Sequence, residues 1–480
     1  MSIKESLVAR GRALFFLANN PISLIGVIIT SATGISMILF WAYELFHQGP
    51  MNPYAGIFLF LMLPTFFLAG LGIIPAGILL RRWNLQRKGE LTDVYPQIDL
   101  KDTKFRHALS FVVVATLVNL FIIGIAAIRG TEHLDSVQFC GQTCHTVMAP
   151  EYAAFVNSPH SRVGCVQCHI GPGASWFVKS KLSGTRQVFA VAFHTYSTPI
   201  PSPVTQLRPA RETCEQCHWP SKFHGDKLFV KTHFADDEAN TRNYTVLMLR
   251  IGGHTGQQKI GIHGRHMSGS GRIEYVTSDE RREKIPLVIH TGEDGKVVEF
   301  VGKGADPAAL SQAERRTMDC IDCHNRPTHA FEMPSGAVDS VMASGGISAK
   351  LPFIKKTGVE LIQGTYQDQD AAEKEIKVRL EDFYRNKYPE VYKNEKAAID
   401  AAGSQLAAIY KRNVFPSMKL TWGTHPNHIG HTDTVGCFRC HDDEHKSKEG
   451  KSITQECNAC HAILAQEETN PKILKDMGIE

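Results

Sequence analysis

Residues 165–169 read CVQCH, two cysteines three positions apart that are followed at once by a histidine. The same CxxCH pattern recurs at residues 214–218, 320–324, 437–441 and 457–461, and residues 140–145 read CGQTCH, with one extra residue between the cysteines. All twelve cysteines of the 480-residue chain therefore fall into six pairs, and each pair precedes a histidine. Because the pattern uses every cysteine, it indicates that the same kind of site occurs several times along the chain.

CxxCH is the attachment sequence of a c-type haem. Two thiols bond to one porphyrin, and the adjoining imidazole reaches the iron as an axial ligand. The predicted attachment residues are Cys140, Cys144, Cys165, Cys168, Cys214, Cys217, Cys320, Cys323, Cys437, Cys440, Cys457 and Cys460. The predicted proximal ligands are His145, His169, His218, His324, His441 and His461. We therefore expect six covalently attached haems; the alternative is a set of zinc ribbons or disulfides, which also use paired cysteines.

The first motif departs from the pattern because three residues separate Cys140 from Cys144. Residues three apart and residues four apart both share a face of a helix, so a single turn can present either pair of thiols together. We expect a haem here too. A motif that is not recognised would leave these two cysteines free or in a disulfide.

Three long apolar runs, Ile22–Phe46, Ala55–Leu80 and Ala108–Ile128, precede the first motif. Each is long enough to cross a hydrocarbon core of about 30 Å. Signal-peptide apolar regions are shorter, so we expect three retained membrane helices. No histidine lies within the three runs, which argues against a membrane-embedded haem held by two facing histidines.

Lysine and arginine flank these runs unevenly: they occur before the first run and between the second and third, but not in the loop HQGPMNPY at residues 47–54. The positive-inside rule places the N-terminus and the second loop in the cytoplasm. Everything after about residue 130 then lies on the opposite side, where bacteria attach c-type haem. We expect a bacterial inner-membrane protein with a periplasmic haem domain and no role in binding nucleic acid.

The expected fold is a mainly α-helical, membrane-anchored chain: three transmembrane helices, then a cytochrome domain with little regular structure and a small β-rich insertion. KLFVKTHF, YTVLMLRIGG, GRIEYVTSD and KIPLVIHTGEDGKVVEFVG alternate as strands do. Residues 351–366 and 371–412 are typical of helices, interrupted at Pro389. The expected segments are 1–21 (cytoplasmic), 22–130 (anchor), 131–219 (haems 1–3), 220–318 (β-rich insertion), 319–349 (haem 4), 350–418 (helical) and 419–480 (haems 5 and 6).

Sixteen of the 22 histidines lie outside the motifs, and a haem used only for electron transfer commonly has two strong axial ligands. Each of these residues has an alternative interpretation as a surface or supporting histidine. Candidates for the second ligand are His160, His263, His266, His329, His425, His428 and His431.

The third apolar run followed by FCGQTCHTVMAPEY, SPHSRVGCVQCHIGPG, RETCEQCHWP and MDCIDCHNRPTH resembles the NapC/NirT family of membrane-anchored multihaem quinol dehydrogenases. The later NVFPSMKLTWGTHPNHIGH and CFRCHDDEH resemble larger inner-membrane cytochromes that feed periplasmic or extracellular electron acceptors.

The resemblance implies roles for particular residues. Met148 takes the place of the methionine that follows the first haem motif in the family, although it stands three residues after His145. His160 and His329 match the family's exchanged ligands, which implies that His160 completes the fourth haem and His329 the second. Basic and polar residues just beyond the second motif lie where the family faces the quinol. They are Lys179, Lys181 and Gln187.

The resulting functional hypothesis is an electron-transfer protein with quinol dehydrogenase activity. It would oxidise menaquinol or another quinol of the membrane pool and pass electrons through six haems to periplasmic multihaem cytochromes or a reductase. Two alternatives stay open: a terminal reductase of a small oxyanion, which needs a haem with an open iron position, and an electron-wire subunit that receives electrons from a protein partner.

Overall fold

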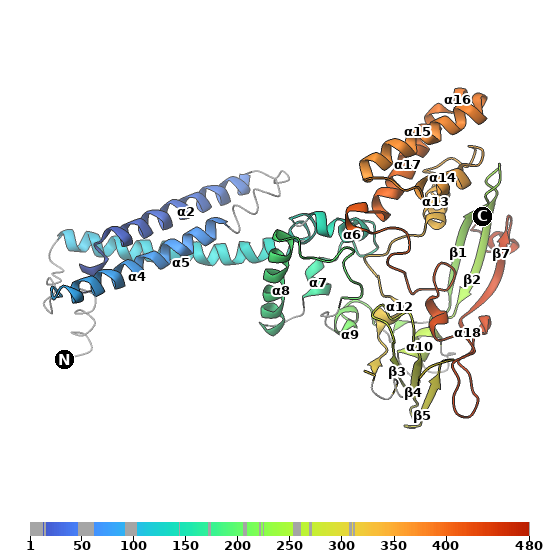
Figure 1. Ribbon diagram of the computed structural model, residues 1–480, viewed down its shortest axis with the longest axis horizontal. Coiled ribbons are helices and arrows are strands. Elements are labelled where there is room, and N and C mark those ends of the chain that lie inside the picture. The colour runs from blue at the N-terminus through green and yellow to red at the C-terminus, as the bar shows by residue number, and fades with distance from the viewer. Residues whose placement is uncertain are drawn as a thin grey trace. The chain divides into compact units, whose positions relative to one another are not determined.

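The computed structural model describes residues 13, 16–46, 62–91, 103–143, 145–170, 174–204, 209–219, 222–223, 225–252, 261–267, 271–306, 310 and 313–479. The chain divides into two compact units, Met1–His145 and Thr146–Glu480. The first contains the candidate membrane helices, and the second contains many helices and two small sheets (Figure 1). The expected fold class, three candidate membrane helices followed by a mainly α-helical part with a β-rich portion, is confirmed.

Three helices of the first unit are long and apolar enough to cross a membrane: α2 (Pro21–Phe46), α4 (Leu63–Arg87) and α5 (Thr103–Leu134). Residues 55–61 of the second expected run lie outside the described residues. The helices continue beyond the apolar runs, because α4 ends at Arg87 rather than Leu80 and α5 ends at Leu134 rather than Ile128. The first haem motif therefore begins closer to the last membrane helix than the hydropathy of the sequence predicts.

Helices α2 and α4 lie side by side (Figure 1) because small residues line their contact. A Cβ atom on Gly26 would come within 2.8 Å of the Gly70 carbonyl oxygen, and one on Gly77 within 2.5 Å of the Ser23 hydroxyl. Ser23 also donates a 2.9 Å hydrogen bond to the Ile74 carbonyl. Lipid provides no hydrophobic driving force between helices, so close packing and such hydrogen bonds hold them together.

The second unit contains two antiparallel sheets, and all their strands except β7 lie in the expected β-rich region, residues 220–318. The first sheet has the order β1 (Lys227–Phe234), β2 (Arg242–Leu249) and β7 (His461–Glu468). The second has the order β5 (Val297–Val301), β4 (Leu287–Thr291), β3 (Arg272–Val276) and β6 (Arg316–Thr317). The expected hairpin at GEDGK joins β4 to β5. Strand β7 lies far along the chain from the rest of its sheet and was not among the expected strands.

A separate helical part of the second unit comprises α13 (Pro334–Ala343), α14 (Ile354–Ile362), α15 (Gln369–Lys387), α16 (Pro389–Asn394) and α17 (Lys396–Asn413). Helix α15 buries a stripe with a spacing of four residues, which includes Ile376 and Leu380, against the apolar face of α17. As expected, Pro389 interrupts the helical region, because α15 ends before it and α16 starts there.

The remaining elements are short. They are η2 (Phe139–Thr143), α6 (His145–Val156), α7 (Cys165–His169), α8 (Ala174–Ala192), α9 (Ala210–Cys214), α10 (Ile262–His266), α12 (Cys320–Cys323), η4 (Pro416–Met418), η5 (Gly436–Arg439), α18 (Cys457–Cys460) and α19 (Lys472–Asp476). Five of them, α7, α9, α12, η5 and α18, coincide with or adjoin the five regular CxxCH motifs. Each regular motif thus lies in or beside a single helical turn. Contacts with neighbouring segments, rather than a long helix, hold that turn in place.

Candidate haem-binding sites

Each regular motif folds as one turn that places its histidine directly over its first cysteine. The backbone amides of His218 and His324 each donate to the carbonyl of the cysteine four residues earlier, at 2.8 Å. The amide of His441 does the same to Cys437 at 3.1 Å. One turn therefore presents both cysteines and the histidine on the same side, as attachment to a single porphyrin requires.

The irregular motif has a different local structure. Phe139–Thr143 forms a five-residue π-helix, which contains Cys140 and ends immediately before Cys144. A π-helical turn holds more residues than an α-helical turn and is a way to accommodate an inserted residue. The extra residue of this motif therefore coincides with a backbone form that can absorb it. Cys144 lies outside the described residues, as does the side chain of His145.

A second imidazole faces the histidine of every regular motif. The distances between ring centroids are 6.2 Å for His169 and His329, 5.9 Å for His218 and His160, 6.3 Å for His324 and His263, 5.8 Å for His441 and His266, and 6.1 Å for His461 and His431. Two imidazoles bonded to opposite sides of one metal ion at about 2 Å have ring centroids about 6 Å apart. The five pairs therefore have the separation that two axial ligands of one haem iron need.

Hydrogen bonds orient these second histidines. The Nδ1 atoms of His160, His263 and His329 lie 3.1, 2.6 and 3.0 Å from the backbone carbonyls of Pro327, Ile251 and Glu151. His266 makes the same contact with Ile262 at 2.8 Å. A carbonyl partner requires the proton on Nδ1, which leaves Nε2 as the neutral nitrogen that can bind a metal.

Burial also favours the neutral form of two motif histidines, His169 and His324. It lowers the pKa of His169, and the facing His329 lowers it further. Burial and the two neighbours His263 and His218 lower the pKa of His324 in the same way. An imidazole must be deprotonated to bind a metal, so this environment suits axial ligation.

The pairing corrects one expectation. The family resemblance implied that His160 serves the fourth motif, but His160 faces His218 of the third motif, whereas His263 faces His324 of the fourth. The reason is a chain of local contacts: the segment after the fourth motif supplies the Pro327 carbonyl for His160, and the end of β2 supplies the Ile251 carbonyl for His263. The expected partnership of His329 with the second motif agrees with the structure.

Two candidate histidines face no motif histidine among the described residues. His428 is buried, and its pKa is lowered to about 4, mainly by burial and next by Arg439. His425 is also buried and stacks on Phe331, and burial lowers its pKa to about 4 as well. His266, which was a weaker candidate, instead faces His441. The GIHGRH segment thus supplies two of the facing histidines, because one short helix, α10, carries both.

A buried ion pair fixes the second site. Arg326 is 5% exposed and holds Glu151 through its NH2 group at 3.0 and 3.1 Å. The Glu151 carboxylate also lies 3.1 Å from His329 Nδ1. Helix α6, which carries Glu151, is therefore tied to the segment after the fourth motif. Glu151 lies in the stretch FCGQTCHTVMAPEY that carries the family resemblance, but the sequence alone gave it no role.

The five regular motifs adjoin one another in chain order. Element α7 contacts α9, and α9 contacts α12. The thiols of Cys214 and Cys320 share a hydrogen bond, which joins the third and fourth motifs. Cys437 of the fifth motif lies within electrostatic range of Cys323 of the fourth and Cys460 of the sixth. The second to sixth motifs thus form a continuous row.

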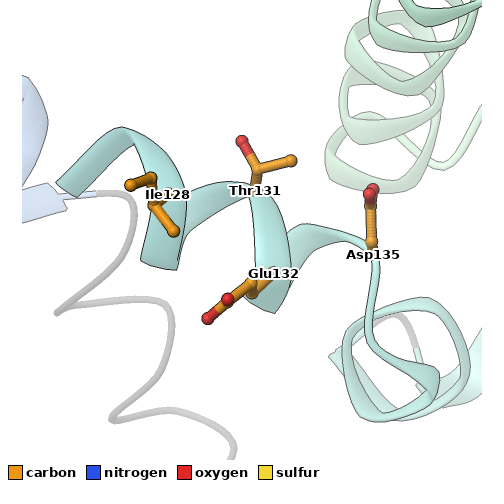
Figure 2. Close-up of a pocket in the computed structure, with 4 residues that line it drawn as sticks. All are labelled: Ile128, Thr131, Glu132 and Asp135. Carbon is orange, nitrogen blue, oxygen red and sulfur yellow. The ribbon is translucent and has the colours of Figure 1, made fainter. Parts of the chain in front are cut away.

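The residues expected to face a quinol lie on α8, where the side chains of Lys179 and Gln187 are exposed. The side chain of Lys181 lies outside the described residues. A cavity of about 620 Å³ lies instead near the end of α5, lined by Ile128, Thr131, Glu132 and Asp135 (Figure 2). It lies a few residues before the first motif, and two carboxylates face it. Their spacing of three residues on a helix was visible in the sequence but was not recognised.

Comparison with known proteins identifies the family. The model of the NapC/NirT cytochrome c family, N-terminal region, matches residues 102–201. The chain is 43% identical over 460 residues to the cytochrome c-type protein ImcH of Geobacter sulfurreducens, an alignment that covers 94% of this chain and 89% of that relative. The chain belongs to the NapC/NirT family of c-type cytochromes. Membership means covalently bound haem, electron transfer and membrane anchoring, as the motifs and the three helices predicted.

A second relative matches a shorter part of the chain. The cytochrome c-type protein NrfH of Wolinella succinogenes is 29% identical over 122 residues, which is 25% of this chain and 68% of that protein. No solved structure matches the chain. The similarity to ImcH therefore extends over 460 residues of the chain, whereas that to NrfH covers 122.

Proposed function

We propose that this NapC/NirT-family cytochrome oxidises a membrane quinol, menaquinol or another, and delivers the electrons to an acceptor on the periplasmic side of the bacterial inner membrane. The observation that carries the proposal is the position of the first motif: Cys140 follows the end of membrane helix α5, Leu134, by six residues. Hydropathy falls at Arg129, so about 9 Å of helix and then six residues that span at most about 22 Å separate the lipid that holds the quinol from the first attachment site.

Six haems are proposed, one for each cysteine pair. Five would be held between His169 and His329, His218 and His160, His324 and His263, His441 and His266, and His461 and His431, which is what the ring separations near 6 Å support. The first would be held by Cys140, Cys144 and His145, with Met148 beside it on α6. When bound, each haem accepts and releases one electron at a time.

The facing histidines favour electron transfer over the alternative of an oxyanion reductase. A reductase needs a site with an open iron position, whereas each of the five regular motifs has an imidazole that would occupy that position. The row of motifs from the second to the sixth also favours a path toward a protein acceptor, such as a periplasmic multihaem cytochrome or a reductase.

A quinol releases two protons as well as two electrons. Glu132 and Asp135 line the cavity near the first motif and are the carboxylates best placed to accept these protons (Figure 2). Glu132 also lies 3.2 Å from Arg129, a contact between two exposed side chains that would orient the carboxylate. Lys179, Lys181 and Gln187 remain proposed as residues that contact the quinol headgroup.

The decisive experiment mixes the purified protein anaerobically with a reduced menaquinol analogue while the haem absorbance is followed. Rapid reduction supports the proposal. An absence of reduction by quinol, combined with full reduction by dithionite, would favour the electron-wire alternative, in which a protein partner supplies the electrons. Glu132→Gln is expected to slow reduction by quinol at least tenfold, and Glu390→Gln, an exposed change in α16, serves as the matched control.

A further inference from the structure

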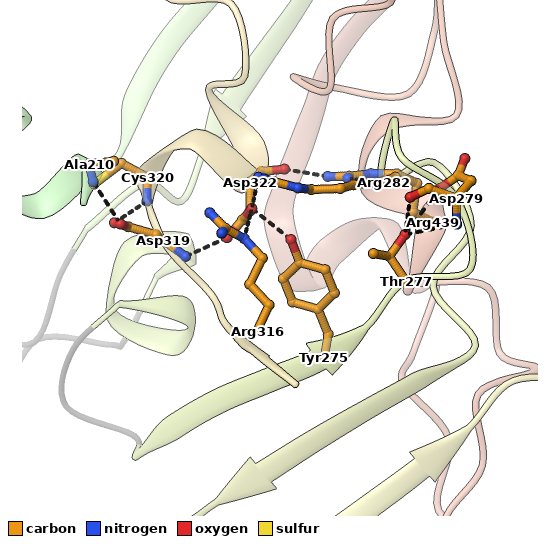
Figure 3. A network of polar contacts seen from close by, with 10 residues as sticks. All are labelled: Ala210, Tyr275, Thr277, Asp279, Arg282, Arg316, Asp319, Cys320, Asp322 and Arg439. Atoms are coloured by element: carbon orange, nitrogen blue, oxygen red, sulfur yellow. Dashed lines mark hydrogen bonds and ion pairs between the residues drawn. The ribbon is translucent and has the colours of Figure 1, made fainter. Parts of the chain in front are cut away.

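The fourth motif contains a buried carboxylate, and the charged groups that contact it come from outside the motif. Asp322, between Cys320 and Cys323, is 3% exposed. It accepts hydrogen bonds from the Tyr275 hydroxyl at 2.7 Å, from Arg282 at 3.2 Å and from Arg316 at 3.0 Å (Figure 3). Two guanidinium groups thus share one carboxylate directly beside a haem-attachment site.

The fifth motif contributes a third guanidinium to the same place. Arg439, between Cys437 and Cys440, donates to the backbone carbonyls of Gly436 at 2.9 Å, Arg282 at 2.8 Å and Asp322 at 2.5 Å. Its partners are carbonyl oxygens, and in the described part of the chain no carboxylate lies within ion-pair distance of it. Arg439 therefore fastens the fourth motif to the fifth and leaves its positive charge uncompensated between them.

The charges at this junction do not balance. Arg282, Arg316 and Arg439 are permanently positive, because a guanidinium does not deprotonate in proteins, and Asp322 supplies one negative charge. Asp319 lies 3.9 Å from Arg211, which offsets it, and Asp442 bonds to His445. Burial raises the pKa of Tyr275 and lowers that of His428, so both are neutral. The Asp322 cluster (Asp322, Arg282, Arg316 and Arg439) thus has an excess of two positive charges among its own side chains. Asp279, drawn beside it in Figure 3, accepts hydrogen bonds from the amides of Glu283 and Lys284 and makes no ion pair with these arginines in the described part of the chain.

We propose that the Asp322 cluster raises the reduction potentials of the haems at the fourth and fifth motifs above those at the neighbouring motifs. Reduction adds one electron to a site and forms or breaks no bond there, so a fixed positive charge nearby stabilises the reduced form. The charges act strongly because they are partly buried and water screens them little. The proposal rests on the proposed haems at these motifs.

The position of the Asp322 cluster in the row of motifs determines how the raised reduction potentials affect electron flow. The fourth and fifth motifs lie in the interior of the row, between the third motif and the sixth. A quinol delivers two electrons together, whereas haem sites take one each. Two adjacent sites of raised potential hold both electrons, which frees the sites nearer the membrane to accept the next pair.

A potentiometric titration of the haem absorbance, on the intact detergent-solubilised protein, tests the inference. Arg439→Gln should move two of the resolved one-electron components to lower potential and leave the others in place. Arg282→Gln should lower the same components, and Asp322→Asn, which removes the negative charge, should raise them. Arg439→Lys keeps the charge but not the three carbonyl contacts, so its potentials should stay close to those of the unaltered protein.

Arg379→Gln is the matched control, because Arg379 is an exposed arginine of α15 that pairs with Glu375. Intact mass measures haem attachment in each variant, and loss of haem mass would count against the proposed haem sites rather than against the tuning. Unchanged midpoints in both Arg439→Gln and Arg282→Gln would overturn the inference. So would an equal shift in Arg439→Gln and Arg439→Lys, because the contacts rather than the charge would then set the potential.

Discussion

His169 and His329 lie with their imidazole ring centroids 6.2 Å apart, although one ends the second motif and the other follows the fourth. The Nδ1 atom of His329 is held by the Glu151 carbonyl at 3.0 Å, which leaves its Nε2 atom available. Two distant parts of the chain thus meet at one proposed iron. The same arrangement recurs at the other four regular motifs, and it makes the ligand assignment testable one residue at a time.

His329→Ala is expected to convert one low-spin haem to a high-spin or five-coordinate form without changing the number of attached haems, because the cysteines and His169 are untouched. Electron paramagnetic resonance and the visible spectrum measure the spin state, and intact mass measures attachment. His194→Ala, at an exposed histidine beside Tyr196, is the control and should leave the spectrum unaltered. A His329→Ala spectrum equal to that of the control would remove His329 from the ligand set.

His160→Ala should produce the same spectral change at a different haem. The double variant with His329→Ala should therefore show twice the high-spin amplitude of either single variant, because His160 faces the third motif and His329 the second. Equal amplitudes in the single and double variants would mean that the two histidines serve one iron.

Glu151→Gln should lower the free energy of unfolding by about 3 kcal/mol, since it leaves the buried Arg326 guanidinium without its counter-charge. Arg326 is 5% exposed, and the Glu151 carboxylate is its bidentate partner. Denaturant unfolding followed by circular dichroism measures the change. Glu375→Gln removes an exposed partner of Arg379 and should cost less than about 1 kcal/mol. A similar loss in both variants would mean that the buried pair contributes no more than a surface pair.

His425 should make stability depend on pH in the acidic range. Burial lowers its pKa to about 4, from about 6.5 in the unfolded chain. Between these values the unfolded state binds the proton and the folded state does not, so stability is complete above about pH 6.5 and falls as the pH drops toward 4. The loss amounts to at most about 3 kcal/mol.

The variant His425→Phe keeps the stacking on Phe331 and removes the titration, so it should flatten the stability profile between pH 6.5 and 4. Thermal unfolding measured across this range gives the comparison. A profile as steep as that of the unaltered protein would show that other groups cause the acid sensitivity.

Intact mass should reveal six haem additions in the unaltered protein and five in a Cys140→Ser, Cys144→Ser double variant. The π-helix at Phe139–Thr143 is the reason to expect attachment at the irregular motif, because it absorbs the additional residue. Five additions in the unaltered protein would instead leave Cys140 and Cys144 as thiols or as a disulfide.

Met148→Ala should slow reduction by quinol several-fold while reduction by dithionite stays nearly unchanged, because Met148 lies on α6 just after the first motif, where the quinol is proposed to react. Stopped-flow absorbance with each donor measures the two rates. Met477→Ala, at a partly exposed methionine after α19, is the control. Equal slowing with both donors would place the entry of quinol electrons elsewhere.

The cysteine pairs predicted a c-type cytochrome and the apolar runs predicted three membrane helices. Both features could be predicted because covalent attachment and membrane crossing impose fixed spacings on the sequence. The partners of the motif histidines were harder to predict, since nothing local connects His266 with His441 or His263 with His324. The resemblance to the NapC/NirT family implied that His160 serves the fourth motif, whereas in the structure it faces His218 of the third. The roles of Glu151 and Asp322 could not be predicted from the sequence for a related reason. A single acidic residue forms no recognisable motif, and these two act through buried contacts with residues far along the chain.

The expected division of residues 131–480 into five segments remains a prediction, because the structure separates only the two units at His145. The end of α5 was misjudged by six residues, since hydropathy falls at Arg129 while the backbone stays helical to Leu134. A helix can leave the membrane without ending, so the hydropathy of a sequence locates the lipid boundary rather than the helix boundary.

The pairing of β7 with β2 has a consequence for biogenesis. Leu249 pairs with His461, and the Arg250 amide donates to the Cys460 carbonyl at 2.9 Å, so the sixth motif completes the first sheet. If the residues after α5 are exported N-terminus first, as the proposed orientation requires, this sheet closes only after residues 461–468 have crossed the membrane. Closing so long a loop is also slow. In the proposed orientation, the haem-attachment machinery would therefore meet the earlier motifs on a chain whose first sheet still lacks β7.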